Sequence, residues 1–321
     1  MPYMYKKAGS NKTNRNASEL ASLSGKVILI TGAGGMLGSA FKIMLDHYAP
    51  KNNVIALARY QLDVADRDSV IAVSAKKPDI IIHCAANVNA DHCEDYPDAC
   101  YKIQVEGTQN IIELAKKVNA KIFYPQSFLI FSGGNLPITE ETMPSPLSAY
   151  GKYKLEAEKL LMEQLPDTLT VRMAGFFGGY EKDKNFVGKF ISHIAKIIKE
   201  NPGPQEVGDR VWQPTYTHDL AYNSLLLLAK QKTGIYNMAS HGEASFYDLA
   251  CEIVGRLNLN SLVRIVRAPA EKFNKKEKAA RPSKAVMLNK RLIREGMDRQ
   301  RPWQESLGEY LDHPYFISLF R

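Results

Sequence analysis

Short apolar runs alternate with amphipathic stretches through the first half of the chain. The runs are KVILI, NVIALA, DIIIHCAA, KIFYPQS and LTVRMAG. Helix-like sequence follows each of the first four. Continuous apolar strands separated by helices are typical of a parallel sheet that helices cover on both faces. We therefore expect an α/β fold with a doubly wound, Rossmann-type parallel sheet.

A glycine-rich turn follows the first apolar run. KVILI leads directly into TGAGGMLGSAFKIML, in which Gly32, Gly35 and Gly38 have the spacing G-x-x-G-x-x-G. Glycines at this spacing allow a tight turn, close approach of the backbone to a pyrophosphate, and tight packing of the next helix, whose N-terminus supplies N–H groups. Because a strand precedes the turn and an amphipathic helix follows it, the motif predicts a dinucleotide site rather than a turn needed only for packing.

The residues that select between NAD and NADP follow the second run. About twenty residues beyond Gly38, where a carboxylate would bind the ribose 2′-hydroxyl of NAD, the chain has Ala58 and Arg59. A carboxylate there would repel a 2′-phosphate, whereas an arginine can pair with it. The pattern favours NADPH, with NADH as the alternative. The other interpretation of Arg59 is an exposed charge at a strand end.

The segment SAYGKYKLEAEKL is typical of the start of an amphipathic helix. Tyr150 and Lys154 share one face of it, whereas Tyr153 has Ala157 in place of a basic residue and is expected to pack. An ammonium beside a phenol lowers the phenol's pKa towards a value useful for proton transfer. Ser127 ends the fourth run, where it can face the crevice or only bond its own backbone. We predict that this serine, tyrosine and lysine polarise a carbonyl and deliver a proton while a nicotinamide delivers hydride.

The regular alternation of strands and helices ends near residue 178. Beyond it come the breaks NPGPQ and RPSK, two helical patches and a late strand in GIYNMA. We expect an NAD(P)-binding Rossmann domain over residues 25–178 and a smaller, irregular, mainly substrate-binding region over residues 179–321. Residues 1–24 are polar, lack the apolar core of a secretory signal and contain MYKKAGS, so we expect a disordered tail or an expression-vector linker there.

Positive charge is concentrated late in the sequence. Residues 264–301 contain 13 Lys or Arg against 4 Asp or Glu, while the whole chain has a net charge of +8. Such a segment can bind nucleic acid or supply cations to a phosphate-bearing substrate. Because no aromatic interleaving or nucleic-acid motif accompanies it, we expect mainly a solvated basic face and no nucleic-acid partner.

The cysteines, histidines and apolar runs bear on redox state, metals and membranes. The 4 cysteines form no C-x-x-C pair, and the histidines are scattered, so we expect reduced thiols in a cytoplasmic protein without a metal site. The longest apolar stretch, YNSLLLLA, is far shorter than the roughly 18 residues that a membrane span needs. We therefore expect no membrane partner, and a homodimer is left open.

Together these residues resemble the extended short-chain dehydrogenase/reductase superfamily and, within it, the dTDP-4-dehydrorhamnose reductase family. The resemblance covers about residues 26–310. The segments that carry it are TGAGGMLGSA, LDVADRDSV, KPDIIIHCAANVNADHCE, VEGTQNI, FSGGNLPITEETMPSPLSAYGKYKLEAE, NFV, QPTYTHDLA and RPSKAVMLNKRL. The first of them, together with PSPLSAYGKYK and RPSKAVMLNK, points to the reductase branch.

The resemblance implies a role for each matching position. It implies Ser127, Tyr150 and Lys154 as the catalytic set, with the last two also touching the cofactor. The further cofactor positions are Gly32, Gly35, Met36, Leu37, Gly38, Arg59, Asp63, Val64, Ala85, Ala86, Asn87 and Ala174. The substrate positions are Val88, Ser127, Phe128, Gly175, Asn185, Trp212 and Arg281. Simpler alternatives are a helix cap for Asp63, strand-end packing for Val64 and the alanines, core packing for Trp212 and a surface charge for Arg281.

The chain departs from the family pattern on the sugar-facing side. The family usually has Thr-Asp where this chain has Ser127-Phe128, and Ser-Trp where it has Ala174-Gly175. Sugar-nucleotide 4,6-dehydratases need an acid and a base directly after the serine or threonine, and Phe128 and Leu129 supply neither. A different deoxysugar or nucleotide is therefore open.

The expected function is reduction of a nucleotide-linked 4-keto-6-deoxysugar by NADPH, which supplies a deoxysugar donor for glycan synthesis. One alternative is a nucleotide-sugar 4-epimerase. Another is a non-catalytic, cofactor-binding regulator that resembles the beta subunit of methionine adenosyltransferase. The intact catalytic set favours an enzyme over the regulator.

Overall fold

The computed structural model describes residues 15–134, 137–200, 203–274 and 277–320. Its centre is a six-stranded, fully parallel sheet with the strand order β10-β5-β4-β3-β1-β2. The strands are β1 (Val27–Thr31), β2 (Asn53–Leu57), β3 (Ile80–His83), β4 (Lys121–Ser127), β5 (Leu169–Met173) and β10 (Gly234–Met238). The five predicted runs and the late strand are all in this sheet, which confirms the doubly wound Rossmann-type fold.

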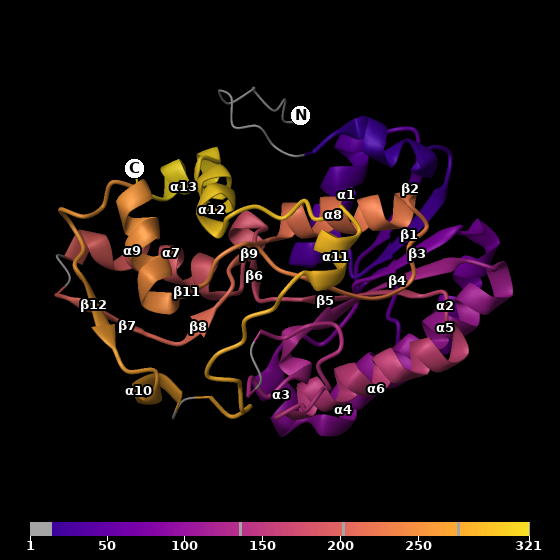
Figure 1. The fold of residues 1–321 in the computed structure, drawn as a ribbon, viewed down its shortest axis with the longest axis horizontal. Helices are drawn as coiled ribbons and strands as arrows, with labels where there is room; N and C mark the ends of the chain where they lie inside the picture. The colour runs from indigo at the N-terminus through magenta and orange to yellow at the C-terminus, as the bar shows by residue number, and fades with distance from the viewer. Residues whose placement is uncertain (1–14, 135–136, 201–202, 275–276, 321) are drawn as a thin grey trace.

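Helices cover both faces of the sheet, as Figure 1 shows. The helices associated with the sheet are α1 (Met36–Tyr48), α2 (Arg67–Ala72), α3 (Ala90–Asp95), α4 (Pro97–Tyr101), α5 (Gly107–Val118), α6 (Ala149–Gln164), α8 (Thr217–Ala229) and α11 (Lys290–Arg294). Tighter or wider turns link them: η2 (Val73–Lys76), the π-helical η3 (Lys102–Glu106) and η4 (Phe128–Ile130).

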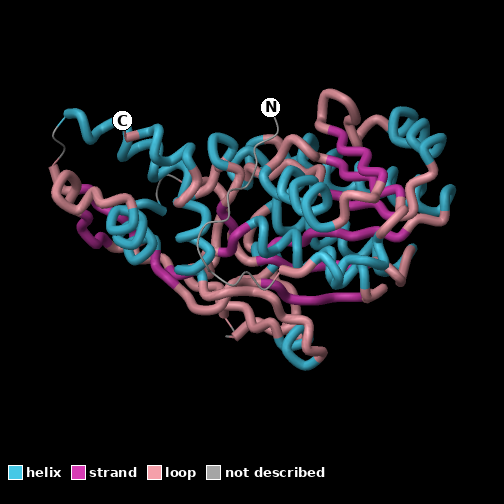
Figure 2. The backbone as a smooth tube through the Cα atoms, turned by 90° about the horizontal axis from the view of Figure 1, so that it is seen from above, coloured by secondary structure: helices cyan, strands magenta, loops and turns pink. Residues whose placement is uncertain are grey.

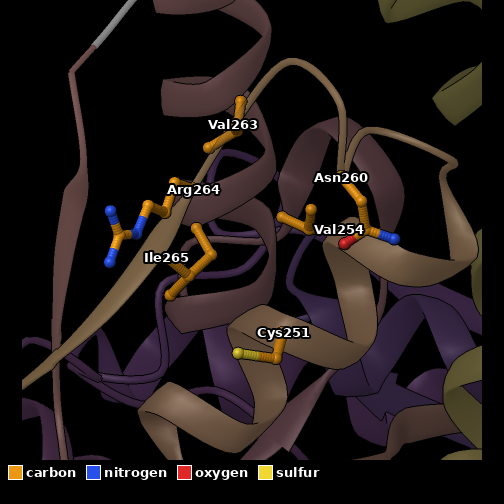
Figure 3. A pocket seen from close by; sticks show the side chains of 6 residues that line it. All are labelled: Cys251, Val254, Asn260, Val263, Arg264 and Ile265. Atoms are coloured by element: carbon orange, nitrogen blue, oxygen red, sulfur yellow. The ribbon is translucent and has the colours of Figure 1, made fainter.

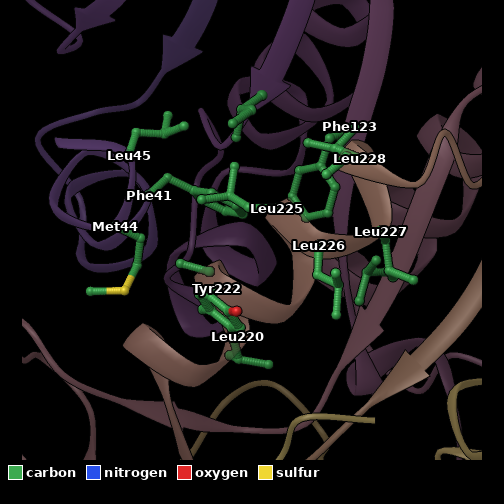
Figure 4. Packing of buried hydrophobic residues seen from close by; sticks show 14 of the residues in the cluster. Phe41, Met44, Leu45, Phe123, Leu220, Tyr222, Leu225, Leu226, Leu227 and Leu228 are labelled. Carbon is green, nitrogen blue, oxygen red and sulfur yellow. The ribbon is translucent and has the colours of Figure 1, made fainter. Parts of the chain in front are cut away.

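Alternate side chains of each strand enter different cores. Ile28 and Ile30 of β1 pack with α1 and α8, in the cluster drawn in Figure 4, and Phe123 of β4 joins them. Leu29 of β1 faces the opposite core, where it meets residues of α5 and α6 such as Ile111. Because both faces are buried, these strands are continuously apolar instead of alternating with polar residues.

A second core lies beyond the carboxyl edge of the sheet, at the left of Figure 1. Its helices are α7 (Phe186–Ile197), α9 (Phe246–Arg256), α10 (Glu271–Asn274), α12 (Trp303–Leu311) and α13 (Pro314–Leu319), with the turns η5 (Tyr180–Lys182) and η6 (Ile198–Glu200). Its short strands are β6 (Phe176–Phe177), β7 (Gln205–Gly208), β8 (Val211–Trp212), β9 (Thr215–Tyr216), β11 (Ala244–Ser245) and β12 (Ile265–Ala268), paired as β6 with β9, β7 with β12 and β8 with β11. Figure 2 shows the same two parts from above.

The division between the two parts is not a single point along the chain. Beyond residue 178, α8 packs against α1, and β10 pairs in parallel with β5 at the edge of the sheet. The predicted boundary at residue 178 therefore separates elements that the structure packs together. Within the described part of residues 179–321, the second core takes residues from α7, α9, α12 and α13, whereas Ala279, Ala285 and Met287 belong to clusters with Tyr150 or Ala174.

The N-terminal segment departs from its prediction. Residues Ala17–Leu23 form the 3₁₀ turn η1, and Leu20 and Leu23 are buried in the core beside α8. The Tyr222 hydroxyl accepts a hydrogen bond from the Asn16 amide at 2.6 Å. The prediction of a disordered tail or vector linker is therefore wrong for residues 15–24, because apolar and hydrogen-bonded contacts hold them, and residues 1–14 lie outside the described part.

Candidate active site

The glycine turn lies where β1 ends, at the edge of the sheet that holds the carboxyl ends of all six strands. Gly32 has φ +64°, and a Cβ there would lie 2.7 Å from the Ala85 amide nitrogen. A Cβ on Gly38 would lie 2.5 Å from the Gly32 carbonyl oxygen. These two glycines therefore bring β1, α1 and the end of β3 together, whereas Gly34 and Gly35 are exposed at the start of α1. This exposed helix N-terminus is the kind of site that binds a phosphate.

The remaining predicted residues of the turn lie around it. Met36 is half-buried, and Leu37 is buried in the core, so only the backbone of Leu37 can face a ligand at the turn. The turn thus meets both demands of a pyrophosphate site, a close-packed base and open backbone amides.

The end of β2 carries the residues expected near the adenosine. The Arg59 side chain is 78% exposed, and its closest carboxylate is Asp63 at 3.8 Å, so the guanidinium is accessible. Asp63 accepts a hydrogen bond from the Ala65 amide at 3.0 Å, but the helix cap weighed for it is supplied by Asp66, whose side chain accepts from the Asp68 and Ser69 amides. Val64 is buried and its carbonyl accepts a hydrogen bond from Asn110 at 2.9 Å.

A buried hydrogen-bond chain ties the ends of β1 and β3 together. The Thr108 hydroxyl donates to the Gln104 carbonyl at 2.6 Å, so it accepts from Nε2–H of His83 at 3.2 Å. The other ring nitrogen, Nδ1, then accepts from the Thr31 hydroxyl at 2.9 Å. Burial lowers the pKa of His83 to about 3, so the ring is neutral and this tautomer is fixed.

The four residues after β3 run along the same edge. The Ala85 amide donates to the Thr31 hydroxyl at 3.2 Å, and the Asn87 carbonyl accepts from the Gln104 amide at 3.1 Å. Ala85, Ala86 and Asn87 are half-buried, and Val88 is 71% exposed. Their backbone is thus held in place while part of their surface stays accessible.

Tyr150 and Ser127 meet at the carboxyl end of β4. Ser148 caps α6 by accepting from the Gly151 amide at 3.2 Å, which places Tyr150 in the first turn of the helix. Burial raises the pKa of the Tyr150 phenol, and a hydrogen bond with the Ser127 side chain opposes that rise. Ser127 also accepts from the Leu129 amide at 3.1 Å, so it both ends its strand and reaches the phenol.

Lys154 lies one turn further along α6 and is buried. Its amine donates to the Pro125 carbonyl at 2.8 Å and lies 3.8 Å from the centre of the Tyr124 ring. Burial lowers the pKa of Lys154 to about 7, and Glu158 opposes that shift. The pKa of the Tyr150 phenol is set here by burial and by Ser127, so the effect of Lys154 on the phenol stays a prediction, whereas Tyr153 packs edge-on against Tyr101 as expected.

The predicted substrate residues divide into two groups. A Cβ on Gly175 would lie 2.4 Å from Cε3 of Trp212 and 3.5 Å from the Phe128 ring, so these three residues form one apolar contact next to Ser127. Trp212 also contacts the Phe246 ring at 5.3 Å, as in the core-packing interpretation. Ala174 is buried in the cluster that Phe128 packs against, and the Asn185 side chain donates to the Phe176 carbonyl at 2.7 Å.

A late segment that we call the strap, residues 277–284, lies against α3. The Ala279 amide donates to Asp91 at 2.9 Å, and Arg281 pairs with the same carboxylate at 3.2 Å. Ala279 is buried in one cluster with Tyr150, Cys93 and Cys100. The strap thereby brings Arg281 to α3 and Ala279 next to Tyr150, which sequence spacing alone does not reveal.

Arg281 and Arg210 share one carboxylate. Arg210 binds Glu277 through both terminal nitrogens, at 3.1 and 2.8 Å, and Arg281 lies 3.3 Å from it. Elsewhere the basic segment is paired within the chain, so the expected solvated basic face is only partly present. These pairs are Arg267 with Asp248, Lys272 with Glu206, Lys278 with Asp95, Lys284 with Glu243, Lys290 with Glu141, Arg299 with Glu19, and Arg301 with Asp219.

A pocket of about 390 Å³ lies in the second core, between α9 and β12, and its lining includes none of the predicted site residues. Figure 3 shows this lining. Cys251 and Arg264 line it with mainly apolar neighbours, and the arginine side chain is directed away from the cysteine. Within the described ranges no group of three or more His, Cys, Asp or Glu is arranged to hold a metal ion. Nor does that part of the chain contain a helix with the length and apolarity to cross a membrane.

Comparison with known proteins identifies the family. Residues 26–316 match the model of the RmlD substrate binding domain. The chain belongs to the RmlD substrate-binding domain family. Its fold superposes on a dTDP-4-dehydrorhamnose reductase of Clostridium acetobutylicum with a TM-score of 0.81 and 34% identity, covering 89% of this chain and 98% of that one. The dTDP-4-dehydrorhamnose reductase of Bacillus anthracis, solved in complex with NADP, superposes with a TM-score of 0.80 and 27% identity. This match covers 89% of this chain and 98% of that one.

RmlD-family similarity also extends to a protein of another kind. The chain is 27% identical to the beta subunit of methionine adenosyltransferase 2 from Bos taurus, over 94% of this chain and 92% of that protein. The relatives named dTDP-4-dehydrorhamnose reductase nevertheless support an oxidoreductase over this alternative.

Proposed function

We propose that this protein is an NADPH-dependent reductase of a nucleotide-linked 4-keto-6-deoxysugar. The observation that carries the proposal is the placement of Tyr150, buried in the first turn of α6, and Ser127, at the end of β4, at the sheet edge that also holds the glycine turn. The solved RmlD relatives that match along most of this chain are named dTDP-4-dehydrorhamnose reductases, and one holds NADP. The epimerase alternative is not favoured by these relatives.

The residues at the edge fit the cofactor. Gly32 and Gly38 leave no room for a Cβ, and the exposed amides at the start of α1 can bind the pyrophosphate. Arg59 is accessible for the 2′-phosphate, which supports NADPH over NADH. The bound nicotinamide would supply the hydride to the carbonyl carbon.

Side chains of this protein supply the proton for the carbonyl oxygen and hold the carbonyl group in place. Tyr150 gives its phenolic proton to the carbonyl oxygen, and Ser127 donates a hydrogen bond to that oxygen. Burial keeps the phenol protonated, which suits an acid. Lys154, in its charged form, stabilises the phenolate that remains and holds the nicotinamide ribose.

The diphosphate of the substrate has a candidate partner in the two arginines that bind Glu277. Arg210 and Arg281 converge on that carboxylate, so a diphosphate replacing it would meet two guanidinium groups. Phe128, Gly175 and Trp212 would form the apolar side of the sugar site. A cytoplasmic location is part of the same proposal and rests on the sequence alone, and a homodimer stays open.

A substrate panel tests the function. Purified protein is mixed with NADPH and a series of nucleotide-linked 4-keto-6-deoxysugars, and NADPH consumption is followed at 340 nm, roughly the absorbance maximum of the reduced nicotinamide. The proposal expects consumption with at least one sugar and a product alcohol at C4. Tight NADPH binding without consumption across the panel would contradict it and favour the regulator. Interconversion of C4 epimers without net consumption would favour the epimerase.

A further inference from the structure

A buried ion pair joins β5 to α6 one helical turn beyond Lys154. Arg172 of β5 donates to both oxygens of Glu158, from Nη2 at 2.6 Å and from Nε at 3.3 Å. Each of these two side chains is 4% exposed. Glu158 lies one helical turn beyond Lys154 on α6. Because a buried ion pair often adds little net stability, this one invites a functional explanation.

The immediate contacts of the Lys154 amine are neutral. They are the Pro125 carbonyl and the Tyr124 ring, which orient the amine but carry no negative charge. An ammonium placed there without a nearby anion would lose its proton readily, because burial disfavours the charged form.

The titratable groups around the amine come from each element packed on it. His83 and Cys84 approach from the end of β3, Tyr124 from β4, Tyr150 and Glu158 from α6, and Arg172 from β5. Burial leaves His83 neutral, and it raises the pKa values of Cys84 to about 12 and of Tyr124 and Tyr150 well above neutrality, so none of these is an anion. Within this group Glu158 is the carboxylate.

Arg172 explains why the Glu158 carboxylate can stay charged inside the protein. A guanidinium that donates to both oxygens of a carboxylate compensates its charge inside the protein and holds it in one orientation. The negative charge of Glu158 raises the pKa of Lys154 and so opposes the loss of its proton that burial favours.

We propose that Glu158, held by Arg172, is a positioning residue that keeps the Lys154 amine protonated during catalysis. The inference rests on the proposed function, in which a charged Lys154 stabilises the Tyr150 phenolate. The inference is tested by measuring the protonation of Lys154 directly. It can therefore be wrong while the proposed function is right, and the reverse also holds.

The test follows the ¹³Cε resonance of Lys154 by NMR as the pH of the full-length protein is raised, with Lys154→Met to assign the signal. In Glu158→Gln the titration midpoint should fall by about one pH unit or more, because a unit charge at short range is removed. The high-pH limb of the NADPH-dependent rate should fall by the same amount. Glu158→Asp restores the charge and should return both midpoints towards the wild-type values.

Two further variants control for lost stability. Glu158→Gln leaves Arg172 without its partner, so the double variant Glu158→Gln/Arg172→Met removes the pair as a unit and should still lower the midpoint. Glu309→Gln breaks a different ion pair, with Arg15 and Arg301, and should leave the midpoint unchanged.

The outcomes separate the two proposals. A Lys154 midpoint that is the same in wild type, Glu158→Gln and the double variant overturns the inference, whatever the turnover. A lowered midpoint in a protein whose wild type reduces none of the sugars supports the charge assignment and overturns the proposed function.

Discussion

Tyr150 and Tyr153 lie three residues apart on α6 but have different surroundings. Tyr150 is buried, and Ser127 lowers the pKa that burial raises, whereas Tyr153 packs on Tyr101. We expect Tyr150→Phe to lower kcat by about 10² to 10⁴, the usual contribution of a general acid, and to leave the Kd for NADPH unchanged. Tyr153→Phe is the matched control and should keep near-wild-type turnover. Unchanged kcat in Tyr150→Phe would rule out the phenol as the proton donor.

Arg59 tests the preference between the two nicotinamide cofactors. Its exposed guanidinium has only a distant contact with Asp63, at 3.8 Å, so little holds it away from a ligand. Arg59→Ala should raise the KM for NADPH about tenfold, since a charge-assisted pair is lost, and leave the KM for NADH within about twofold. Steady-state kinetics with both cofactors measure this. Arg67→Ala, which removes an exposed arginine on α2, serves as the control; a parallel rise for both cofactors in Arg59→Ala would contradict the assignment.

Residue patterns predict the site where spacing within one element decides it. Tyr150 and Lys154 share a helix face, and the glycine spacing indicates a close-packed turn, so both could be predicted from the sequence. Glu158 has the same spacing from Lys154 and could have been found in this way. The contact of Trp212 with Gly175 could not, because it joins residues far apart in the chain through side-chain shape.

At the scale of elements, η1 depends on charges at the far end of the chain. Arg15, just before η1, pairs with Asp219 on α8 at 2.6 Å and with Glu309 on α12 at 3.0 Å, and its side chain is 7% exposed. The sequence around Arg15 is polar, and its partners Asp219 and Glu309 lie 204 and 294 residues further along the chain, so no local pattern indicates that the segment is ordered. The misprediction of residues 15–24 therefore has a definite cause.

The Arg15 contacts predict a loss of stability. Arg15→Ala should lower the free energy of unfolding by about 2 kcal/mol, because Asp219 keeps Arg301 and Ser306 as partners but loses one buried cation. Calorimetry should show a Tm reduced by several degrees. Lys42→Ala, which breaks an exposed pair with Asp46, should change Tm far less. Equal effects in the two variants would mean that Arg15 is not a structural anchor.

At the scale of the whole molecule, the strap connects the second core to the catalytic helix. Asp91 on α3 receives both the Ala279 amide and the Arg281 guanidinium. Asp91→Asn should loosen the strap and raise the KM for the sugar nucleotide up to about fivefold, with the Kd for NADPH unchanged. Asp46→Asn on α1 is the control, and a KM equal to that of the wild type would show that the strap does not position the substrate.

The strands and helices of the fold were easier to predict from the sequence than the packing of elements that lie far apart in the chain. Apolar runs and intervening helices indicate the six strands, because burial on both faces leaves a strong pattern. The placement of α8 on α1 and of β10 beside β5 depends on which distant surfaces match, and no local period encodes that.

That placement has a consequence for how the chain is made. During synthesis, residues 25–178 emerge first, but without α8 the apolar face formed by Ile28, Ile30 and the α1 side chains has no cover. The nascent Rossmann half therefore exposes this apolar surface until residue 238 has left the ribosome. Only then can α8 pack on α1 and β10 pair with β5 at the edge of the sheet. A fragment cut at residue 178 would lack both α8 and β10 and would expose the same surface permanently, so we expect it to aggregate.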